Sequence, residues 1–175
     1  MTRCHQVTFA SMLAAILVSA CVPIPIVIPP GALQPVRNWP ATATCPVPAR
    51  SATDGPAMVA LMNAERAKRG LSPLILSPKI SAVAHKYACE AAARDDISHT
   101  GTDGSKVSER LMRGGISALM VAENTASFYR TPAQAMAAWM ASPHHRENIL
   151  RPQARAVGVG QADGVQAIWV VDFTS

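Results

Sequence analysis

Apolar residues recur with a helical period in the first half of the chain. The clearest stripe follows Ser77 and Pro78, a hydroxyl cap and a proline suited to the first helical position. Its apolar residues have the i, i+3, i+4, i+7, i+8, i+11 spacing of a helix with one buried face. An earlier helix is predicted from a cap at Asp54 to a glycine stop at Gly70. The residues of the stripe are Ile80, Val83, Ala84, Tyr87, Ala88 and Ala91.

The second half of the chain predicts three more helices and three strands. The first helix covers residues 105–113, stopped by two glycines, and the second begins at Thr131 and Pro132 and ends at Pro143. Ser142 and Pro143 have the pattern of a third helix start, a hydroxyl cap followed by a proline. Strands are predicted at 119–126, 156–161 and 166–173. The last strand is apolar on both faces, so it needs a covering layer on each side. We therefore expect an α+β fold, a three-layer α-β-α sandwich around a small antiparallel sheet.

The N-terminal region has the pattern of an export signal. Arg3 precedes an apolar run that reaches small residues at 18–20 and then Cys21. This pattern predicts a signal peptide at 1–20 with a lipobox, a lipidated Cys21, a proline-rich tether at 21–52 and a folded domain at 53–175. A plain secretory leader and an uncleaved membrane anchor are the alternatives. The prediction places the protein outside the cytosol, anchored to a membrane of the cell envelope through lipid; in a host with two membranes this is the outer membrane or periplasm.

The cysteines and the charge narrow the picture further. With Cys4 in the leader and Cys21 lipidated, Cys45 and Cys89 remain in an oxidising compartment, where they are most simply a disulfide. A reactive Cys89 is disfavoured because it lies in an apolar helical run, and the nearby His85 is expected to be solvated. The formal net charge is +5, but no Lys/Arg cluster interleaves with aromatic residues. We therefore expect no nucleic-acid partner.

Three polar stretches stand in a fixed order: ISHTG at 97–101, VAENT at 121–125 and WMASPHHRENIL at 139–150. With further matches upstream and downstream, this order resembles the CAP superfamily of cysteine-rich secretory proteins, antigen 5 and pathogenesis-related 1 proteins, in its bacterial SCP-like branch. The resemblance covers roughly residues 57–175 and implies the same α-β-α sandwich. The further matches are Leu61, Asn63, Arg66, Pro73, Leu74, Gly158, Val159, Gly160, Trp169, Val170, Asp172 and Phe173.

The resemblance implies a cleft in which His99, Glu123 and His145 hold a divalent cation such as Zn²⁺. The family's second glutamate has no counterpart here, because residues 139–142 read Trp-Met-Ala-Ser. Two imidazoles and one carboxylate can still hold zinc in an open site. The alternative is purely structural: a turn contact for His99, backbone donors for Glu123 and a local cap for His145. Arg110 and Arg146 are the expected ion-pair partners of Glu123 or Asp172.

Three functions compete on this basis. The first is an exported binding module whose cleft takes a small apolar or envelope ligand, together with a cation. The second is a metal-assisted hydrolase or protease with Glu123 as general base. The third is a structural envelope lipoprotein without cleft chemistry. The missing second carboxylate disfavours the enzyme, since one residue would then be both ligand and base, and we favour the binding module.

Overall fold

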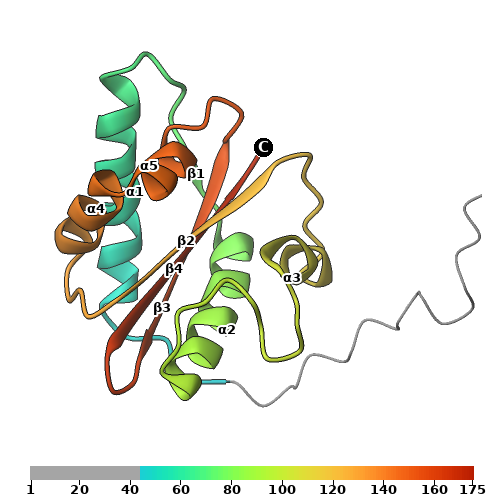
Figure 1. Ribbon diagram of the computed structural model, residues 1–175. Helices are drawn as coiled ribbons and strands as arrows, with labels where there is room; N and C mark the ends of the chain where they lie inside the picture. Colours follow the sequence, from blue (N-terminus) through green and yellow to red (C-terminus); the bar gives the residue numbers. More distant parts are fainter. Residues whose placement is uncertain (1–43) are drawn as a thin grey trace, which may run out of the picture. The chain divides into compact units, whose positions relative to one another are not determined.

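The computed structural model describes residues 44–175, which form five helices and a four-stranded sheet (Figure 1). The predicted leader, Cys21 and most of the tether lie outside the described residues. Within residues 44–175, no helix is both long and apolar enough to cross a membrane. The elements are α1 (Ser51–Ala67), β1 (Ile75–Leu76), α2 (Pro78–Arg94), α3 (Val107–Arg113), β2 (Val121–Ser127), α4 (Pro132–Ala141), α5 (Pro143–Ile149), β3 (Ala156–Asp163) and β4 (Ala167–Thr174).

Three of the four predicted N-cap residues, Ser77, Thr131 and Ser142, precede the first turn of a helix, although the Ser142 side chain makes no capping hydrogen bond. The hydroxyl of Ser77 accepts a hydrogen bond from the Ile80 amide, and the hydroxyl of Thr131 does the same for Gln134. The prediction for the first helix was wrong by one turn, because α1 starts at Ser51 and Asp54 lies within its first turn. Arg50 is already in helical conformation, and the amides of Ser51 and Ala52 donate to the carbonyls of Pro48 and Ala49. The helix therefore begins without a side-chain cap, and a boundary based on Asp54 comes too late.

The strand order is β1-β3-β4-β2. The pairs β3–β4 and β4–β2 are antiparallel, which confirms the predicted core of the sheet. The additional strand β1 pairs in parallel with β3 through Ile75 and Leu76 only, so the sheet is mixed rather than wholly antiparallel. Two residues are too few for a strand period, which is why the sequence pattern missed β1.

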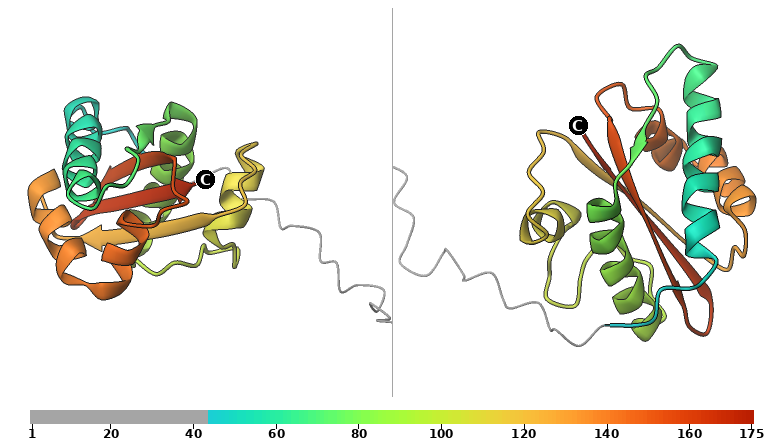
Figure 2. Two further views of the ribbon diagram at one scale, coloured as in Figure 1. Left: turned by 90° about the horizontal axis from the view of Figure 1, so that it is seen from above. Right: turned by 180° about the vertical axis from the view of Figure 1, so that it is seen from behind.

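Helices cover both faces of the sheet, as the two-sided apolar pattern of β4 predicted. Helices α1, α4 and α5 lie on one face and α2 on the other, with α3 beside α2 (Figures 1 and 2). Alternate residues of β4 separate cleanly into two clusters. Trp169, Val171 and Phe173 pack with α1, α4 and α5, whereas Ile168 and Val170 pack with α2.

Helix α2 lies unusually close to β3. A Cβ atom added to Gly158 would overlap the backbone at Ile80 and Ser81, and one added to Gly160 would overlap the backbone at Ala84. The glycines of the G-V-G motif therefore permit backbone-to-backbone contact between helix and strand. This contact fixes the position of α2 along the sheet.

Two other motif residues are structural. Both polar atoms of the Asn63 amide bond the backbone of Leu74, at 3.0 Å and 2.7 Å. Arg66 is fully buried, and its guanidinium donates to four backbone carbonyls, those of Ser72, Ile149, Arg151 and Ala154. Asn63 and Arg66 thus tie α1 to the segment that follows it and to the turn after α5.

Candidate functional site

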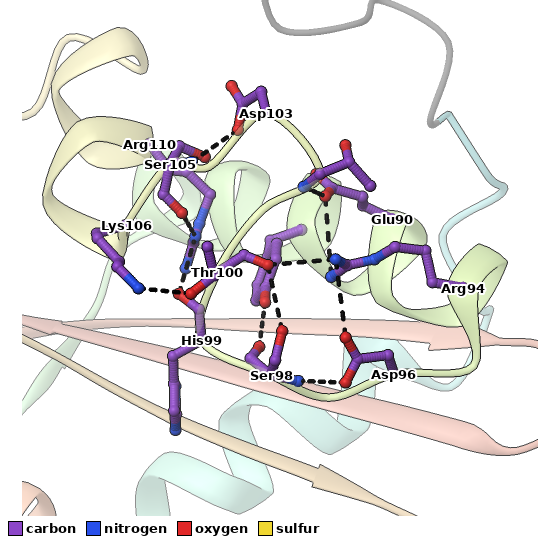
Figure 3. A network of polar contacts seen from close by, with 12 residues as sticks. Glu90, Arg94, Asp96, Ser98, His99, Thr100, Asp103, Ser105, Lys106 and Arg110 are labelled. Atoms are coloured by element: carbon purple, nitrogen blue, oxygen red, sulfur yellow. Dashed lines mark hydrogen bonds and ion pairs between the residues drawn. The ribbon is translucent and has the colours of Figure 1, made fainter.

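The loop that carries His99 is fixed by polar contacts from the end of α2 (Figure 3). Arg94 donates to the carbonyl of Thr100 at 3.2 Å, and the hydroxyl of Tyr87 donates to the carbonyl of Ser98. The buried carboxylate of Glu90 accepts from the amide of Thr102. In Figure 3 the His99 ring points away from these contacts, so the loop is held from one side and presents its imidazole on the other.

Glu123 stands at the centre of the site, on β2. Its side chain is 1% exposed, and each of its oxygens has a different partner. Oε1 lies 2.8 Å from Nδ1 of His99, and Oε2 accepts from the buried guanidinium of Arg110. The Arg110–Glu123 pair confirms one predicted ion pair. Arg146 instead donates to the carbonyl of Met140, so its predicted pairing with a carboxylate is wrong.

Arg110 is itself held from two further directions. Its guanidinium carbon lies 3.7 Å from the centroid of the Tyr87 ring, and Nη1 donates to the carbonyl of Ser105 at 3.0 Å. Stacking on an aromatic ring and hydrogen bonding both favour a buried guanidinium. The cation that neutralises Glu123 therefore has a fixed position.

A second carboxyl group lies next to Glu123. Asp172 of β4 pairs across the sheet with Glu123 and is fully buried. Burial, and then the charge of Glu123, raise the pKa of Asp172 well above its usual range. Neither Asp172 oxygen has a hydrogen-bond partner among the described residues. The raised pKa therefore favours the neutral carboxyl of Asp172 beside the ion pair of Glu123 and Arg110.

His145 enters the site from α5. The Asn124 amide donates to the His145 carbonyl at 3.0 Å, and the Asn148 amide donates to the side-chain oxygen of Asn124 at 2.9 Å. These amides fasten α5 to β2 and so fix His145 relative to Glu123. Burial, and then the charges of His99 and His144, lower the pKa of His145, which favours its neutral form. The neighbouring His144 is exposed.

The structure thus brings the three predicted residues to one region but gives them different roles. Glu123 orients His99 from beneath, because both of its oxygens are engaged within the protein. The Nδ1 contact leaves Nε2 of His99 for an outside partner, and the His99 side chain is 53% exposed. A histidine whose second nitrogen bonds a carboxylate is the usual form of a metal ligand. In this geometry His99 and His145 are the members of the trio that could offer a ring nitrogen to a cation, because both oxygens of Glu123 are engaged within the protein.

A second cluster lies on α2. Cys45 and Cys89 form the predicted disulfide, with their Cα atoms 5.5 Å apart. The expectation that His85 is simply solvated was wrong. Its ring lies between the carbonyls of Gln161 and Cys45, 2.7 Å from Nδ1 and 3.1 Å from Nε2, and Nε2 is 3.5 Å from Sγ of Cys89. The i, i+4 spacing of His85 and Cys89 was the available signal.

A cavity of about 450 Å³ opens beside this cluster. Its lining includes apolar side chains of α2 and the disulfide, together with the basic residues Lys79, Lys86 and Arg113. Arg110 contributes to the wall and also pairs with Glu123, so it joins the cavity to the histidine site. Sequence reasoning did not find this cavity, because it depends on how the segment at Cys45 crosses α2.

Comparisons with known proteins agree with the motifs. The sequence profile of the cysteine-rich secretory protein family (CAP) matches residues 59–173. The uncharacterised protein YkwD of Bacillus subtilis is 33% identical over 116 residues, which are 66% of this chain and 45% of YkwD. The chain thus spans less than half the length of that relative.

Solved structures share the fold. An extracellular protein with an SCP domain from Bacillus anthracis aligns over 75% of this chain and 45% of its own, with 22% identity and a TM-score of 0.67. An outer surface protein of Borrelia burgdorferi aligns over 71% of this chain and 94% of its own, with 23% identity and a TM-score of 0.66. At these identities the likeness concerns the fold alone. The profile match, carried by most of the described domain, shows that the chain belongs to the CAP family of cysteine-rich secretory proteins.

Proposed function

We propose that this protein is an exported, lipid-anchored binding module of the cell envelope. Its histidine site takes a divalent cation, Zn²⁺ in the first instance, and the cavity beside α2 takes a small ligand with an apolar body. Binding, rather than hydrolysis, is the function that the arrangement of charged groups supports best.

The contact between Glu123 and His99 carries the cation proposal. It fixes the ring and directs Nε2 outward, and it raises the basicity of the imidazole toward a metal. His145 supplies a second imidazole that stays neutral, and a neutral imidazole is the form that ligates. Water completes the coordination of such an open site.

The engagement of Glu123 argues against the hydrolase. A general base needs an oxygen within reach of a water molecule, but Oε1 faces His99 and Oε2 faces Arg110. The neighbouring Asp172 is fully buried and carries a raised pKa, so it is no substitute. The exposure of His99 argues in turn against a purely structural role, since a half-exposed ring contributes little packing.

The cavity supports the small-ligand part of the proposal. A volume of about 450 Å³ falls within the usual range for small-molecule sites. Ala82, Val83 and the disulfide offer apolar surface, and the lining also includes Lys86 and Lys79, whose Nζ donates to the Gly115 carbonyl. This charge distribution fits an amphiphile with an apolar body and one anionic end. Mass spectrometry of protein purified without detergent should show such a compound, and its absence from repeated preparations would contradict this part.

Export and anchoring rest on the sequence pattern at 1–21. Cys21→Ala should abolish incorporation of labelled fatty acid and release the protein from the membrane fraction. Cys4→Ala is the matched control, because it removes a cysteine from the leader and leaves the lipobox intact. Fatty-acid labelling of Cys21→Ala at the parental level would refute the anchor.

Calorimetric titration of Zn²⁺ into the oxidised protein tests the cation site. His99→Ala and His145→Ala should each weaken binding by at least about 10-fold, and Glu123→Gln should do so through loss of orientation. His144→Ala is the control, since this exposed neighbour should leave affinity unchanged. Affinity should fall as pH drops, because protonated imidazoles cannot ligate. Equal uptake by all variants, or none by the parent, would show that the three residues are structural.

A further inference from the structure

The two cysteines of the disulfide and His85 form a compact set of potential metal ligands. None of them belongs to the His99 site. His85 and Cys89 lie one turn apart on α2, and the segment before α1 brings Cys45 against them. The two sulfur atoms and a ring nitrogen all lie within 4.8 Å of one another. In the part of the chain that the structure describes, no other three His, Cys, Asp or Glu residues meet this closely.

The surroundings of His85 match those of a metal-bound histidine. The ring has only one proton when neutral, and the shorter contact, 2.7 Å from Nδ1 to the Gln161 carbonyl, is the better place for it. A backbone carbonyl on the far nitrogen is a common way to fix the tautomer of a ligating imidazole. Nε2 then carries the lone pair, 3.5 Å from the sulfur of Cys89. Nε2 also lies 3.1 Å from the Cys45 carbonyl, and this contact must open for Nε2 to ligate a metal.

Distances and nearby donors fit the same interpretation. Zn–S bonds of about 2.3 Å and Zn–N bonds of about 2.0 Å at a tetrahedral angle place sulfur and nitrogen about 3.5 Å apart. Nε2 of His85 already lies 3.5 Å from Sγ of Cys89. The Cys45 amide lies 3.2 Å from the same sulfur, and a hydrogen bond from it favours a thiolate.

We propose that reduction converts this disulfide into a Cys₂His site for Zn²⁺, with Cys45, Cys89 and His85 as ligands. A dithiol reductant supplies two electrons and two protons, the S–S bond breaks to two thiols, and the reductant becomes a disulfide. Zn²⁺ then displaces the two thiol protons and forms two Zn–S bonds and one Zn–N bond, with water as the fourth ligand. The segment at residue 45 thus stays fastened to α2 in both redox states.

Access to the site is already present. Cys45 is only partly buried, and both cysteines and His85 contribute to the wall of the 450 Å³ cavity. A reductant and a hydrated cation can therefore enter without opening the core. Because His99 and His145 take no part, this site is independent of the proposed cation site and is tested separately from it, although it shares a wall with the proposed ligand cavity.

Cobalt absorption spectroscopy tests the proposal on the full chain with Cys4→Ser and Cys21→Ser, which removes the other thiols. After reduction with a phosphine and its removal, one equivalent of Co²⁺ should produce sulfur-to-cobalt charge-transfer absorption that one equivalent of Zn²⁺ abolishes. The oxidised protein should show none. A histidine and carboxylate site gives no such absorption, so the His99 region cannot imitate the signal.

Variants decide which residues bind. His85→Ala and Cys89→Ser should each weaken Co²⁺ binding at least about 10-fold, whereas His99→Ala should leave it unchanged. If reduction unfolds the chain, the readout becomes circular dichroism, and Zn²⁺ should restore the folded spectrum in the parent but not in His85→Ala. Absent charge-transfer absorption without metal-dependent refolding, or equal responses in the parent and His85→Ala, would overturn the proposal.

Discussion

The two faces of the sheet are built on different principles. The face under α1, α4 and α5 buries large apolar side chains, among them Trp139, Trp169 and Phe173. The face under α2 uses alanine and glycine for close contact and holds the buried groups Glu123 and Asp172. Both faces meet in β4, whose alternate residues serve one or the other.

This difference separates stability from chemistry. Large buried side chains contribute most of the apolar area removed from water. The face under α1, α4 and α5, called the first face below, should therefore contribute most of the free energy of unfolding, and the face under α2 is the second face. Small residues on the second face let a helix backbone approach the sheet and leave room for polar groups at its end. Substitutions on the two faces should therefore destabilise the protein for different reasons. On the first face the cause is lost side-chain volume, and on the second it is excess volume or a misplaced charge.

The largest effect is expected at Trp169. Trp169→Ala removes a fully buried ring and the hydrogen bond from its Nε1 to the Tyr129 carbonyl, so the free energy of unfolding should fall by about 3–5 kcal/mol. Urea denaturation measures this. Trp169→Phe keeps most of the volume and should lose much less. A loss below about 1 kcal/mol in Trp169→Ala would contradict the assignment of stability to this face.

Gly160 offers the opposite test. Gly160→Ala adds one methyl group where the α2 backbone already lies, so overpacking should cost about 1–3 kcal/mol or more. The control is Gly55→Ala in α1, where the new Cβ would meet only side-chain atoms at 4.0 Å. That change should be neutral or stabilise the protein by up to about 1 kcal/mol, since alanine favours the helix. Similar losses at both glycines would show that close contact is not confined to the α2 face.

Asp172 should make the free energy of unfolding depend on pH. Since the pKa of Asp172 is raised in the folded state, the folded protein binds the proton more tightly than the unfolded chain. Stability from this group is thus greatest below its unfolded pKa and declines as pH rises toward the folded one. Asp172→Asn keeps the shape of the side chain but does not titrate. Its free energy of unfolding relative to the parent should therefore rise as pH increases from about 3 to about 7.

Denaturation of parent and Asp172→Asn at several pH values tests that expectation. A difference that is independent of pH would show that Asp172 is not the titrating group. If Asp172→Asn were less stable than the parent at pH 7, the folded protein would require the ionised carboxylate of Asp172. A neutral Asp172 in the folded state would then be ruled out.

The smallest effect is expected at His99. Because its side chain is 53% exposed, His99→Ala should change the free energy of unfolding by no more than about 0.5 kcal/mol. The same substitution should nonetheless remove most Zn²⁺ binding. A loss of stability as large as that of Gly160→Ala would instead make His99 a packing residue of the second face.

Sequence reasoning succeeded where periodicity carried the information. The stripe from Ile80 to Ala91 and the two-sided pattern of β4 predicted which layers pack together. It could not supply strand register, and register alone places Asp172 beside Glu123. Nor could it show that Glu123 has no free oxygen, or that the segment at Cys45 brings a carbonyl and a sulfur onto His85. These features depend on long-range packing, which local patterns do not encode.

The strand order has a consequence for how the protein is made. Both antiparallel pairs of the sheet use β4, which is the last of the described strands along the chain, so neither pair can form until residues 167–174 have been synthesised. The carbonyls at residues 149–154 that hold Arg66 arrive almost as late. Before that point only the two-residue pairing of β1 with β3 is available to the sheet. The domain can therefore complete its core only after nearly all of residues 44–175 have been synthesised, and its folding depends on contacts between distant parts of the chain.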